Sequence, residues 1–402
     1  MKTITNTGIQ LNGVSPYATK TVYANISASH TITEGMALFY DRTNSTEDRQ
    51  DYYVGQCTLN NIADFAGVVA SGQTLTGPGE IKIYEYAGGQ GMIDVATDES
   101  VSSGTLLGPV PGSYYLGRCA IVQPVARCVE AVDRSATAGV VRCVYGQGIP
   151  HDSRGKIAAF FDDFFFGGGT TPTTAAADLG KYVLTGGNST ISQADALAGE
   201  SSLDSAAKRA NGVLSIGTAT TGFEGNLQLN GEPFSMRPQT SLFFRARVAP
   251  VTIPATAQIF LGLNLAAATD FTDATSTDYI GFLFEGTTLK FIYAKDGTST
   301  AVETRTGATS VTVSGITGTA NQFEEVAFLV RNRETSVATT KKELQIWTKQ
   351  SGVWTLQSHT TVGASICDNE SLTVAASLDN SADDAAVAIN LDYWEVLNAL
   401  AA

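Results

Sequence analysis

Three histidines, five cysteines and a few close pairs of carboxylates are the residues of this chain that could carry out chemistry. The histidines, His30, His151 and His359, lie far apart, so their spacing predicts neither a Ser–His–Asp set nor a metal-binding pair. The cysteines are odd in number and contain no Cys-x-x-Cys spacing, which argues against a disulfide framework and against a zinc site. We expect small buried cysteines, with a disulfide between neighbouring strands as the alternative in an oxidising medium. The residues concerned are Cys57, Cys119, Cys128, Cys143 and Cys367.

The carboxylate pairs do not have the arrangement of a hydrolase. Glycoside hydrolysis needs two carboxyl groups that flank the scissile bond. Glu324 and Glu325 are adjacent, so on a strand they point to opposite faces and cannot act together. The other local groups are Asp162 with Asp163 and Asp392 with Glu395. We therefore expect no catalytic residues and no enzyme activity.

Metal and cofactor sites are not predicted either. The Asp-rich segments 270–278 and 379–384 could supply oxygen ligands to calcium, but their spacing matches no calcium loop and is typical of polar turns. The glycine-rich segments 88–91 and 167–169 precede no P-loop Lys-Ser/Thr at a helix start, so no nucleotide site follows. The expectation is no metal and no cofactor.

The tryptophans offer a different chemistry, because sugar rings pack on aromatic faces. Trp347 shares a predicted strand face with Glu343 and Lys349, so we expect it to be exposed. Trp394 lies within a strand-like run and is expected to be buried. Trp347 and Trp354 are therefore the candidate glycan platform.

Composition narrows the class of protein. Charged residues are only 16% of the chain and apolar residues 43%, which suits a β-rich protein with true cores. The net charge of −14 falls mostly on residues 157–402, with 14 Lys and Arg against 25 Asp and Glu. This acidic half argues against a nucleic-acid partner.

No apolar stretch reaches the ~20 residues that span a bilayer, so we expect no membrane partner. The first residues resemble no secretory signal, so we expect synthesis in a cytoplasm.

Short strands between Gly and Pro turns fill residues 65–146, as in small antiparallel barrels. Residues 147–156 contain turn formers and charges without an apolar period, and we interpret them as a linker. Before the first domain, residues 1–20 are polar except for spaced apolar positions and are interpreted as an extended arm or a frayed terminus. The predicted organisation is an arm (1–20), a first domain (21–146), the linker and a second domain (157–402). The apolar arm residues, which we expect to contact a partner, are Ile4, Ile9, Leu11 and Val14.

Period-two alternation dominates the second domain. Leu242, Phe244, Ala246 and Val248 share one strand face and the two arginines between them the other. Ile280, Phe282 and Phe284 form another apolar face, as do Leu289, Phe291 and Tyr293. Five Phe within residues 160–166 predict a first strand that is buried on at least one face, and only residues 194–211 could form a short helix. The fold class is therefore all-β: a small antiparallel barrel, then a two-sheet antiparallel sandwich.

Residues 20–146 resemble the lambda-type capsid decoration (cement) proteins of tailed phages. The likeness rests on the order of the Phe65-Ala-Gly-Val-Val strand, the Gly104-Thr-Leu-Leu-Gly turn and the paired strands that end the segment. It implies a tulip-like barrel that assembles as a homotrimer on the outside of a capsid, with the major capsid protein as partner and the virion as location.

Residues 160–398 resemble the concanavalin/laminin-G-like jelly rolls of phage structural proteins. The opening Phe160-Phe-Asp-Asp-Phe, the middle Phe323-Glu-Glu-Val-Ala-Phe and the closing Leu391-Asp-Tyr-Trp-Glu-Val carry this likeness. It implies that the first and last strands pair. The expected function is a decoration protein with an outward-projecting sandwich; the alternative is a carbohydrate-binding adhesin or receptor-binding virion protein that contacts host-surface or environmental glycans.

Overall fold

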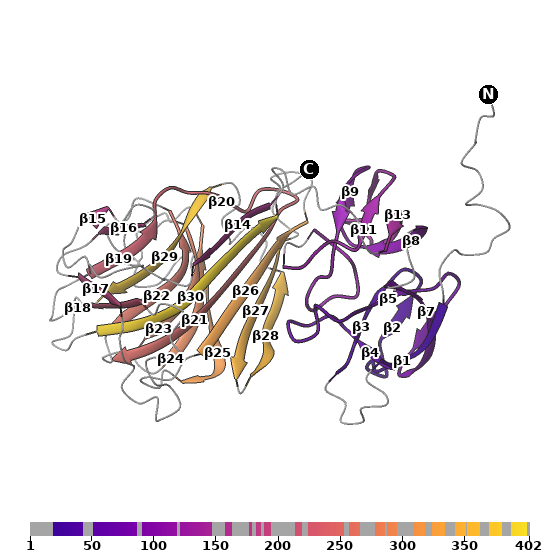
Figure 1. Ribbon diagram of the computed structural model, residues 1–402, viewed down its shortest axis with the longest axis horizontal. Coiled ribbons are helices and arrows are strands. Elements are labelled where there is room, and N and C mark those ends of the chain that lie inside the picture. Colours follow the sequence, from indigo (N-terminus) through magenta and orange to yellow (C-terminus); the bar gives the residue numbers. More distant parts are fainter. Residues whose placement is uncertain are drawn as a thin grey trace. The chain divides into compact units, whose positions relative to one another are not determined.

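The computed structural model contains two compact units, which divide between Ser153 and Arg154. Every regular element among the described residues is a β-strand, apart from isolated turns (Figure 1). In the described part of the chain no helix has the length and hydropathy needed to span a membrane. The structure describes residues 19–42, 51–86, 91–118, 121–146, 157–162, 177–178, 182–185, 189–193, 214–218, 224–252, 257–265, 278–285, 288–295, 309–317, 324–333, 342–350, 352–361, 370–379 and 387–399.

The N-terminal unit is built on a small closed barrel. Its strands follow the order β1-β4-β3-β5-β7, and β7 pairs with β1 to close it. A four-stranded sheet, β10-β11-β13-β8, and the two-stranded pairs β12-β9 and β2-β6 accompany the barrel. The strands are β1 (Thr19–Ala24), β2 (Thr31–Thr33), β3 (Ala37–Tyr40), β4 (Tyr53–Gly55), β5 (Phe65–Val69), β6 (Thr74–Thr76), β7 (Gly79–Glu85), β8 (Gly91–Thr97), β9 (Ser100–Val101), β10 (Leu106–Leu107), β11 (Ala126–Cys128), β12 (Val132–Asp133) and β13 (Gly139–Tyr145).

The Phe65-Ala-Gly-Val-Val segment forms β5 because its glycine permits a close approach of two strands. A Cβ atom at Gly67 would lie 2.2 Å from the backbone oxygen of Tyr84, a distance that no side chain tolerates. Ala66, Val68 and Val69 around it are all buried. The barrel strand therefore depends on glycine at this position.

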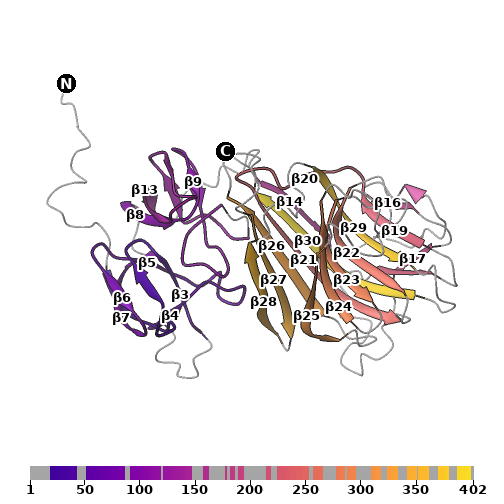
Figure 2. The same cartoon turned by 180° about the vertical axis from the view of Figure 1, so that it is seen from behind.

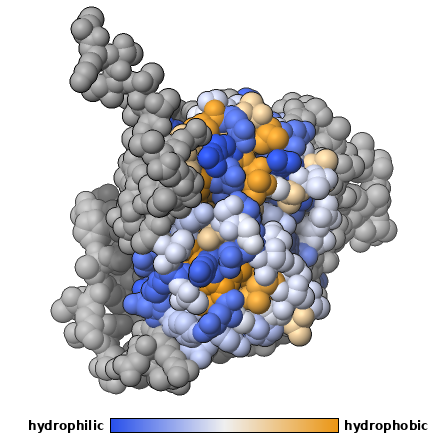
Figure 3. Space-filling model, turned by 90° about the vertical axis from the view of Figure 1, so that its right-hand side faces the viewer, coloured by the Kyte–Doolittle hydropathy of each residue, from blue (hydrophilic) through white to orange (hydrophobic). Residues whose placement is uncertain are grey.

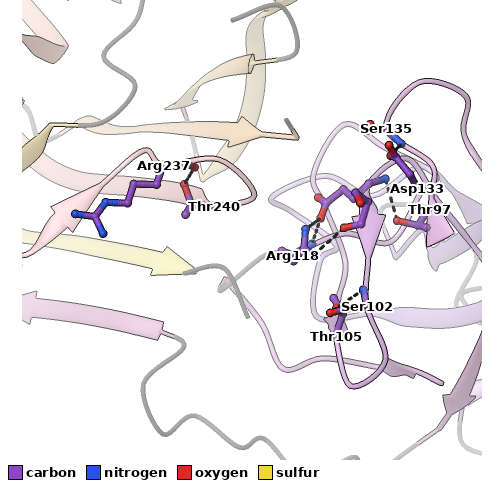
Figure 4. Close-up of polar contacts among 10 residues, drawn as sticks. Thr97, Ser102, Thr105, Arg118, Asp133, Ser135, Arg237 and Thr240 are labelled. Atoms are coloured by element: carbon purple, nitrogen blue, oxygen red, sulfur yellow. Dashed lines mark hydrogen bonds and ion pairs between the residues drawn. The ribbon is translucent and has the colours of Figure 1, made fainter. Parts of the chain in front are cut away.

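A buried ion pair joins two loops of the N-terminal unit. Arg118 Nη1 lies 3.3 Å from Glu99 Oε2, and the backbone N–H of Arg118 donates to the same oxygen at 3.0 Å. Arg118 Nη2 also donates to the carbonyl of Ser100 at 2.7 Å (Figure 4). Both side chains are less than a tenth exposed, so each charge depends on the other to remain compensated.

The C-terminal unit is a sandwich of two large sheets (Figures 1 and 2). We name each after a central strand. The β30 sheet has the order β17-β18-β30-β21-β26-β27-β28, with β14 also paired to β30, and the β29 sheet has the order β15-β16-β19-β29-β22-β23-β24-β25, with β20 also paired to β29. The strands are β14 (Ile157–Asp162), β15 (Ala177–Asp178), β16 (Tyr182–Thr185), β17 (Ser189–Gln193), β18 (Leu214–Thr218), β19 (Glu224–Leu229), β20 (Phe234–Ser235), β21 (Ser241–Thr252), β22 (Gln258–Asn264), β23 (Tyr279–Glu285), β24 (Thr288–Ala294), β25 (Thr309–Thr317), β26 (Glu324–Asn332), β27 (Lys342–Gln350), β28 (Val353–Thr361), β29 (Ser371–Asp379) and β30 (Val387–Ala399).

An aromatic centre holds the two sheets together. Phe244 and Phe328 of the β30 sheet stack with ring centroids 5.2 Å apart, and Phe291 of the β29 sheet lies 5.3 Å from Phe328. Burial of each such side chain stabilises the fold by roughly 1.5–3 kcal/mol. The predicted apolar faces of β21, β23 and β24 all belong to this core, which confirms the period-two interpretation.

The first and last strands of the sandwich pair, as the jelly-roll resemblance implies. β14 lies antiparallel to β30, with Phe160 opposite Val396 and Asp162 opposite Trp394. The buried carboxylate of Asp162 accepts a hydrogen bond from the Tyr182 hydroxyl, and Trp394 Nε1 donates to that hydroxyl at 3.0 Å. Burial and the hydrogen bond to Asp162 raise the pKa of Tyr182. The all-β prediction, barrel then sandwich, is confirmed.

Candidate functional site

The outer face of the β30 sheet carries two aligned rows of side chains, which we call the outer band. Strand register places Phe161, Glu395, Arg245, Ala327, Trp347 and Leu356 in the first row. The second row consists of Tyr393, Arg247, Glu325, Lys349 and Trp354. With strands ~4.8 Å apart, the first row crosses six strands and about 24 Å of sheet. The alternation of β21 positions these groups, because its core-facing residues force Arg245 and Arg247 outward.

Ion pairs fix the polar groups of the outer band. Arg245 Nη2 lies 3.0 Å from Glu395 Oε2, and Arg247 Nη1 lies 2.5 Å from Asp392 Oδ2. Glu325 accepts from Lys349 Nζ at 2.6 Å and from the Tyr393 hydroxyl at 2.8 Å. Asp392 joins this group because a β-bulge interrupts the pairing of β21 with β30 between Arg247 and Val248. The charged side chains are partly exposed and already oriented.

Aromatic rings lie among these ion pairs. Phe161 is 56% exposed, and its ring centroid lies 5.8 Å from that of Tyr393. The Arg245 guanidinium lies 5.2 Å from the Tyr393 ring centroid, and Lys349 Nζ lies 5.6 Å from that of Trp354. The outer band therefore combines one open aromatic face with preoriented donors and acceptors.

The pKa values of two groups in or near the outer band are shifted from their usual values. Burial raises the pKa of the Tyr393 hydroxyl, so it stays a donor to Glu325 across the physiological range. Burial also raises the pKa of Glu324. As expected, Glu324 and Glu325 do not form a pair: Glu325 lies on the outer face, whereas Glu324 is two residues from core-facing Val326.

The expectation that Trp347 is exposed is wrong. It lies on the predicted face, but only 2% of it is exposed, and its Nε1 donates to Gln345 Oε1 at 3.3 Å. Ala327 and Leu356 flank it on the neighbouring strands. Trp354 is 8% exposed beneath Lys349. The open aromatic ring of this face is instead Phe161, while Trp394 is buried as predicted.

Sequence reasoning missed the exposure of Phe161, although one signal was available. Phe160 and Phe161 are adjacent on a strand, so one of them must face away from the core. Phe160 packs against the core, and Phe161 points outward. The Phe-rich run is therefore buried on one face in its described part, residues 160–162.

The other candidate residues that the structure describes do not form a second site. His30 stacks on Tyr114 with centroids 4.6 Å apart, whereas His359 is an exposed residue of β28. Cys57, Cys128 and Cys143 are buried, as expected, and none of the three forms a disulfide. Among the described residues no group of three or more His, Cys, Asp and Glu is placed to hold a metal ion.

Several predictions lie outside the described residues. They concern the arm residues Ile4, Ile9, Leu11 and Val14, the linker 147–156, the short helix at 194–211, and most of both Asp-rich segments. His151, Asp163, Cys119 and Cys367 lie outside them as well.

Comparison with known proteins yields structural similarity alone. No protein-family model matches the chain, and no curated protein matches it. Among solved structures, peanut lectin with a nine-residue peptide shows 10% identity and a TM-score of 0.39 over 61% of this chain and 99% of that chain. Lectin UEA-II complexed with galactose shows 11% identity and a TM-score of 0.38 over 60% and 99%. An endo-1,3-beta-glucanase from Streptomyces sioyaensis shows 10% identity and a TM-score of 0.36 over 61% and 98%.

No property of the site is carried over from these proteins, because the identities and TM-scores are too low. The class that the fold and site define is a two-unit all-β protein whose C-terminal unit is a jelly-roll sandwich. The sandwich agrees with the jelly-roll part of the resemblance. The decoration-protein part remains a proposal.

Proposed function

We propose that this protein binds carbohydrate without catalysis, through the outer band of its C-terminal sandwich. The observation that carries the proposal is the exposed ring of Phe161 beside Tyr393, at the end of the row that holds the ion pair of Arg245 and Glu395. Sugars present an apolar C–H face together with hydroxyl groups. An open aromatic ring supports stacking of the first, and charged groups support strong hydrogen bonds to the second.

The dimensions of the outer band favour an oligosaccharide over a single sugar. Exposed apolar side chains stand at both ends of its first row, Phe161 at 56% and Leu356 at 37%. Between them lie Glu395 and Arg245, whose charged groups are held against each other. Because these side chains are already ordered, a ligand loses little of its binding free energy to their immobilisation.

A glycan array with the full chain, followed by calorimetry on the best ligand, tests the proposal. Phe161→Ala should weaken binding at least tenfold, about 1.4 kcal/mol. Val353→Ala is the matched control, because Val353 is 54% exposed on β28 but lies outside the outer band. If no glycan binds, or if Phe161→Ala and Val353→Ala bind equally well, the outer band is not a carbohydrate site.

We also propose a second function, attachment to a phage capsid as a decoration protein, for the N-terminal unit. The outer face of its β8-β13-β11 sheet exposes Met92 at 43% and Val129 at 37% around the ion pair of Asp94 and Arg142. Figure 3 shows apolar patches rimmed by hydrophilic side chains on one face of the molecule. Apolar surface with a polar rim is typical of protein interfaces. The two functions are compatible, since they use different units. Self-association of the full chain and its binding to capsids are the measurements that test the second.

A further inference from the structure

Two cysteines of the N-terminal unit face each other across neighbouring strands. Cys128 of β11 is the register partner of Cys143 of β13. The N–H of Val129 donates to the carbonyl of Arg142 at 3.0 Å, and the N–H of Gly146 donates to that of Val125 at 3.1 Å. These bonds place the cysteine pair at a position without hydrogen bonds between its own backbone groups, where opposed Cα atoms lie about 4.5 Å apart. That separation falls within the range that disulfides span.

The two sulfur atoms are close to bonding distance. Cys143 Sγ lies 3.7 Å from Cys128 Sγ, and both residues are at most 1% exposed. A disulfide bond measures about 2.05 Å, so a small rotation about each Cα–Cβ bond would bring the atoms together. Cys57 lies in the same core cluster, but its sulfur contacts the carbonyl of Thr58 instead. The pairing is therefore specific to Cys128 and Cys143 among the described cysteines.

We propose that Cys128 and Cys143 form a reversible cross-strand disulfide when the protein meets a low-molecular-weight disulfide such as oxidised glutathione. One protein thiol loses its proton, and its thiolate attacks a glutathione sulfur and releases the first glutathione. The second protein thiol, also deprotonated, attacks the resulting mixed disulfide and displaces the second glutathione. The two protein thiols are oxidised, and one glutathione disulfide is reduced to two thiols.

The native surroundings should make this reaction slow and its product stabilising. The hydrogen bond to Cys128 and burial raise the pKa of the Cys143 thiol, so the attacking thiolate is scarce at neutral pH. The intervening chain is already ordered, since Arg134 donates to the carbonyl of Val140 at 2.8 Å and 3.1 Å. The cross-link therefore acts mainly on the unfolded chain, where it closes a loop of about 15 residues.

Peptide mapping of the full chain tests the proposal directly. Trypsin cuts after Arg127, Arg134, Arg142 and Arg154, so peptides 128–134 and 143–154 carry one cysteine each. After incubation with oxidised glutathione at pH 8.5 and alkylation of the remaining thiols, these two peptides should be linked without reductant and separate with it. The melting temperature of the N-terminal unit should rise by roughly 5–10 °C.

Two variants complete the design. Cys57→Ala should leave the cross-link intact, whereas Cys128→Ala should abolish both the linked peptides and the rise in melting temperature. Absence of the linked peptides, even after incubation just below the melting temperature, would overturn the proposal. A cross-link that lowers the melting temperature would overturn it as well, because it would show that the strands must distort to form it.

Discussion

At the scale of single residues, Glu343 is a carboxylate whose protonation state depends strongly on the fold. Burial alone would raise the pKa of this carboxyl, but His359, Arg331 and Arg333 outweigh it and lower the pKa to about 2. Arg331 Nη1 and Arg333 Nη2 lie 3.1 Å and 2.7 Å from its oxygens. His359 Nε2, at 4.0 Å, is too distant for a hydrogen bond. The two guanidinium groups therefore hold the carboxylate directly.

Because of this arrangement, the stability of the sandwich should vary with pH in the acid range. Because the folded pKa lies below the unfolded value, the stabilisation is present above about pH 5 and is lost as the pH falls toward 2. Its size at neutral pH is on the order of 3 kcal/mol. Glu343→Gln should therefore destabilise the sandwich at pH 7, and its difference from the wild type should shrink toward zero near pH 2. Urea unfolding at a series of pH values measures this difference.

An exposed carboxylate provides the control for this prediction. Asp51, which is 71% exposed opposite Arg42, should show almost no effect on stability when it is changed to Asn. If the Glu343→Gln difference were the same at pH 3 and pH 7, the Glu343 carboxylate would not be the titrating group.

At the scale of elements, β30 is the strand on which the sandwich depends. It pairs with β21 along one edge and with β14 and β18 along the other. Its residues Ile389, Leu391, Trp394 and Val396 are buried in the core between the sheets. Removal of β30 would expose these contacts and leave three strands with an unpaired edge.

A chain that ends at Ser381 should therefore lack a folded sandwich while it keeps a folded N-terminal unit. Circular dichroism and limited proteolysis of the truncated chain check this expectation, with protection limited to residues before Arg154. A cooperative sandwich transition in the truncated chain would mean that β30 is dispensable.

A milder test is Tyr182→Phe, which removes a hydrogen-bond partner of buried Asp162. It should lower the free energy of unfolding of the sandwich by about 1–3 kcal/mol.

The elements were largely predictable from the sequence, whereas the site was not. The period-two alternation in β21, β23 and β24 made their core-facing residues predictable, because successive side chains of a strand point to opposite faces. The exposure of Trp347 could not be predicted in this way, since it depends on Ala327 and Leu356, which only the strand register brings beside it. The ion pair of Glu99 and Arg118 joins two loops and leaves no periodic signal in the sequence.

At the scale of the whole molecule, the two units differ in charge and are proposed to differ in role. Residues 157–402 carry most of the net charge of −14, with 25 acidic against 14 basic residues. An acidic sandwich suits exposure to solvent. The apolar face of the β8-β13-β11 sheet lies in the other unit and is where we expect self-association.

Light scattering of the full chain should give the mass of a trimer at high concentration. Met92→Glu should shift the equilibrium to the monomer, because it places a charge in an apolar contact. Val353→Glu, at an even more exposed apolar position of the sandwich, should leave the trimer unchanged. A strict monomer at every concentration that also fails to bind capsids would contradict the decoration-protein function and leave carbohydrate binding untouched.

The pairing of β14 with β30 also determines how the sandwich reaches its folded state. Phe160 and Val396 are neighbours in the fold but are separated by nearly the whole C-terminal unit in sequence. Contacts of such long sequence separation must close a large loop before they gain any stabilisation, so they slow folding. During synthesis β14 must wait, with Phe161 and its unpaired backbone exposed, until β30 has been made. The N-terminal unit, in which paired strand residues such as Thr19 and Tyr84 lie at most about 65 residues apart, should be folded by then. Newly made chains should be most prone to aggregate in this interval.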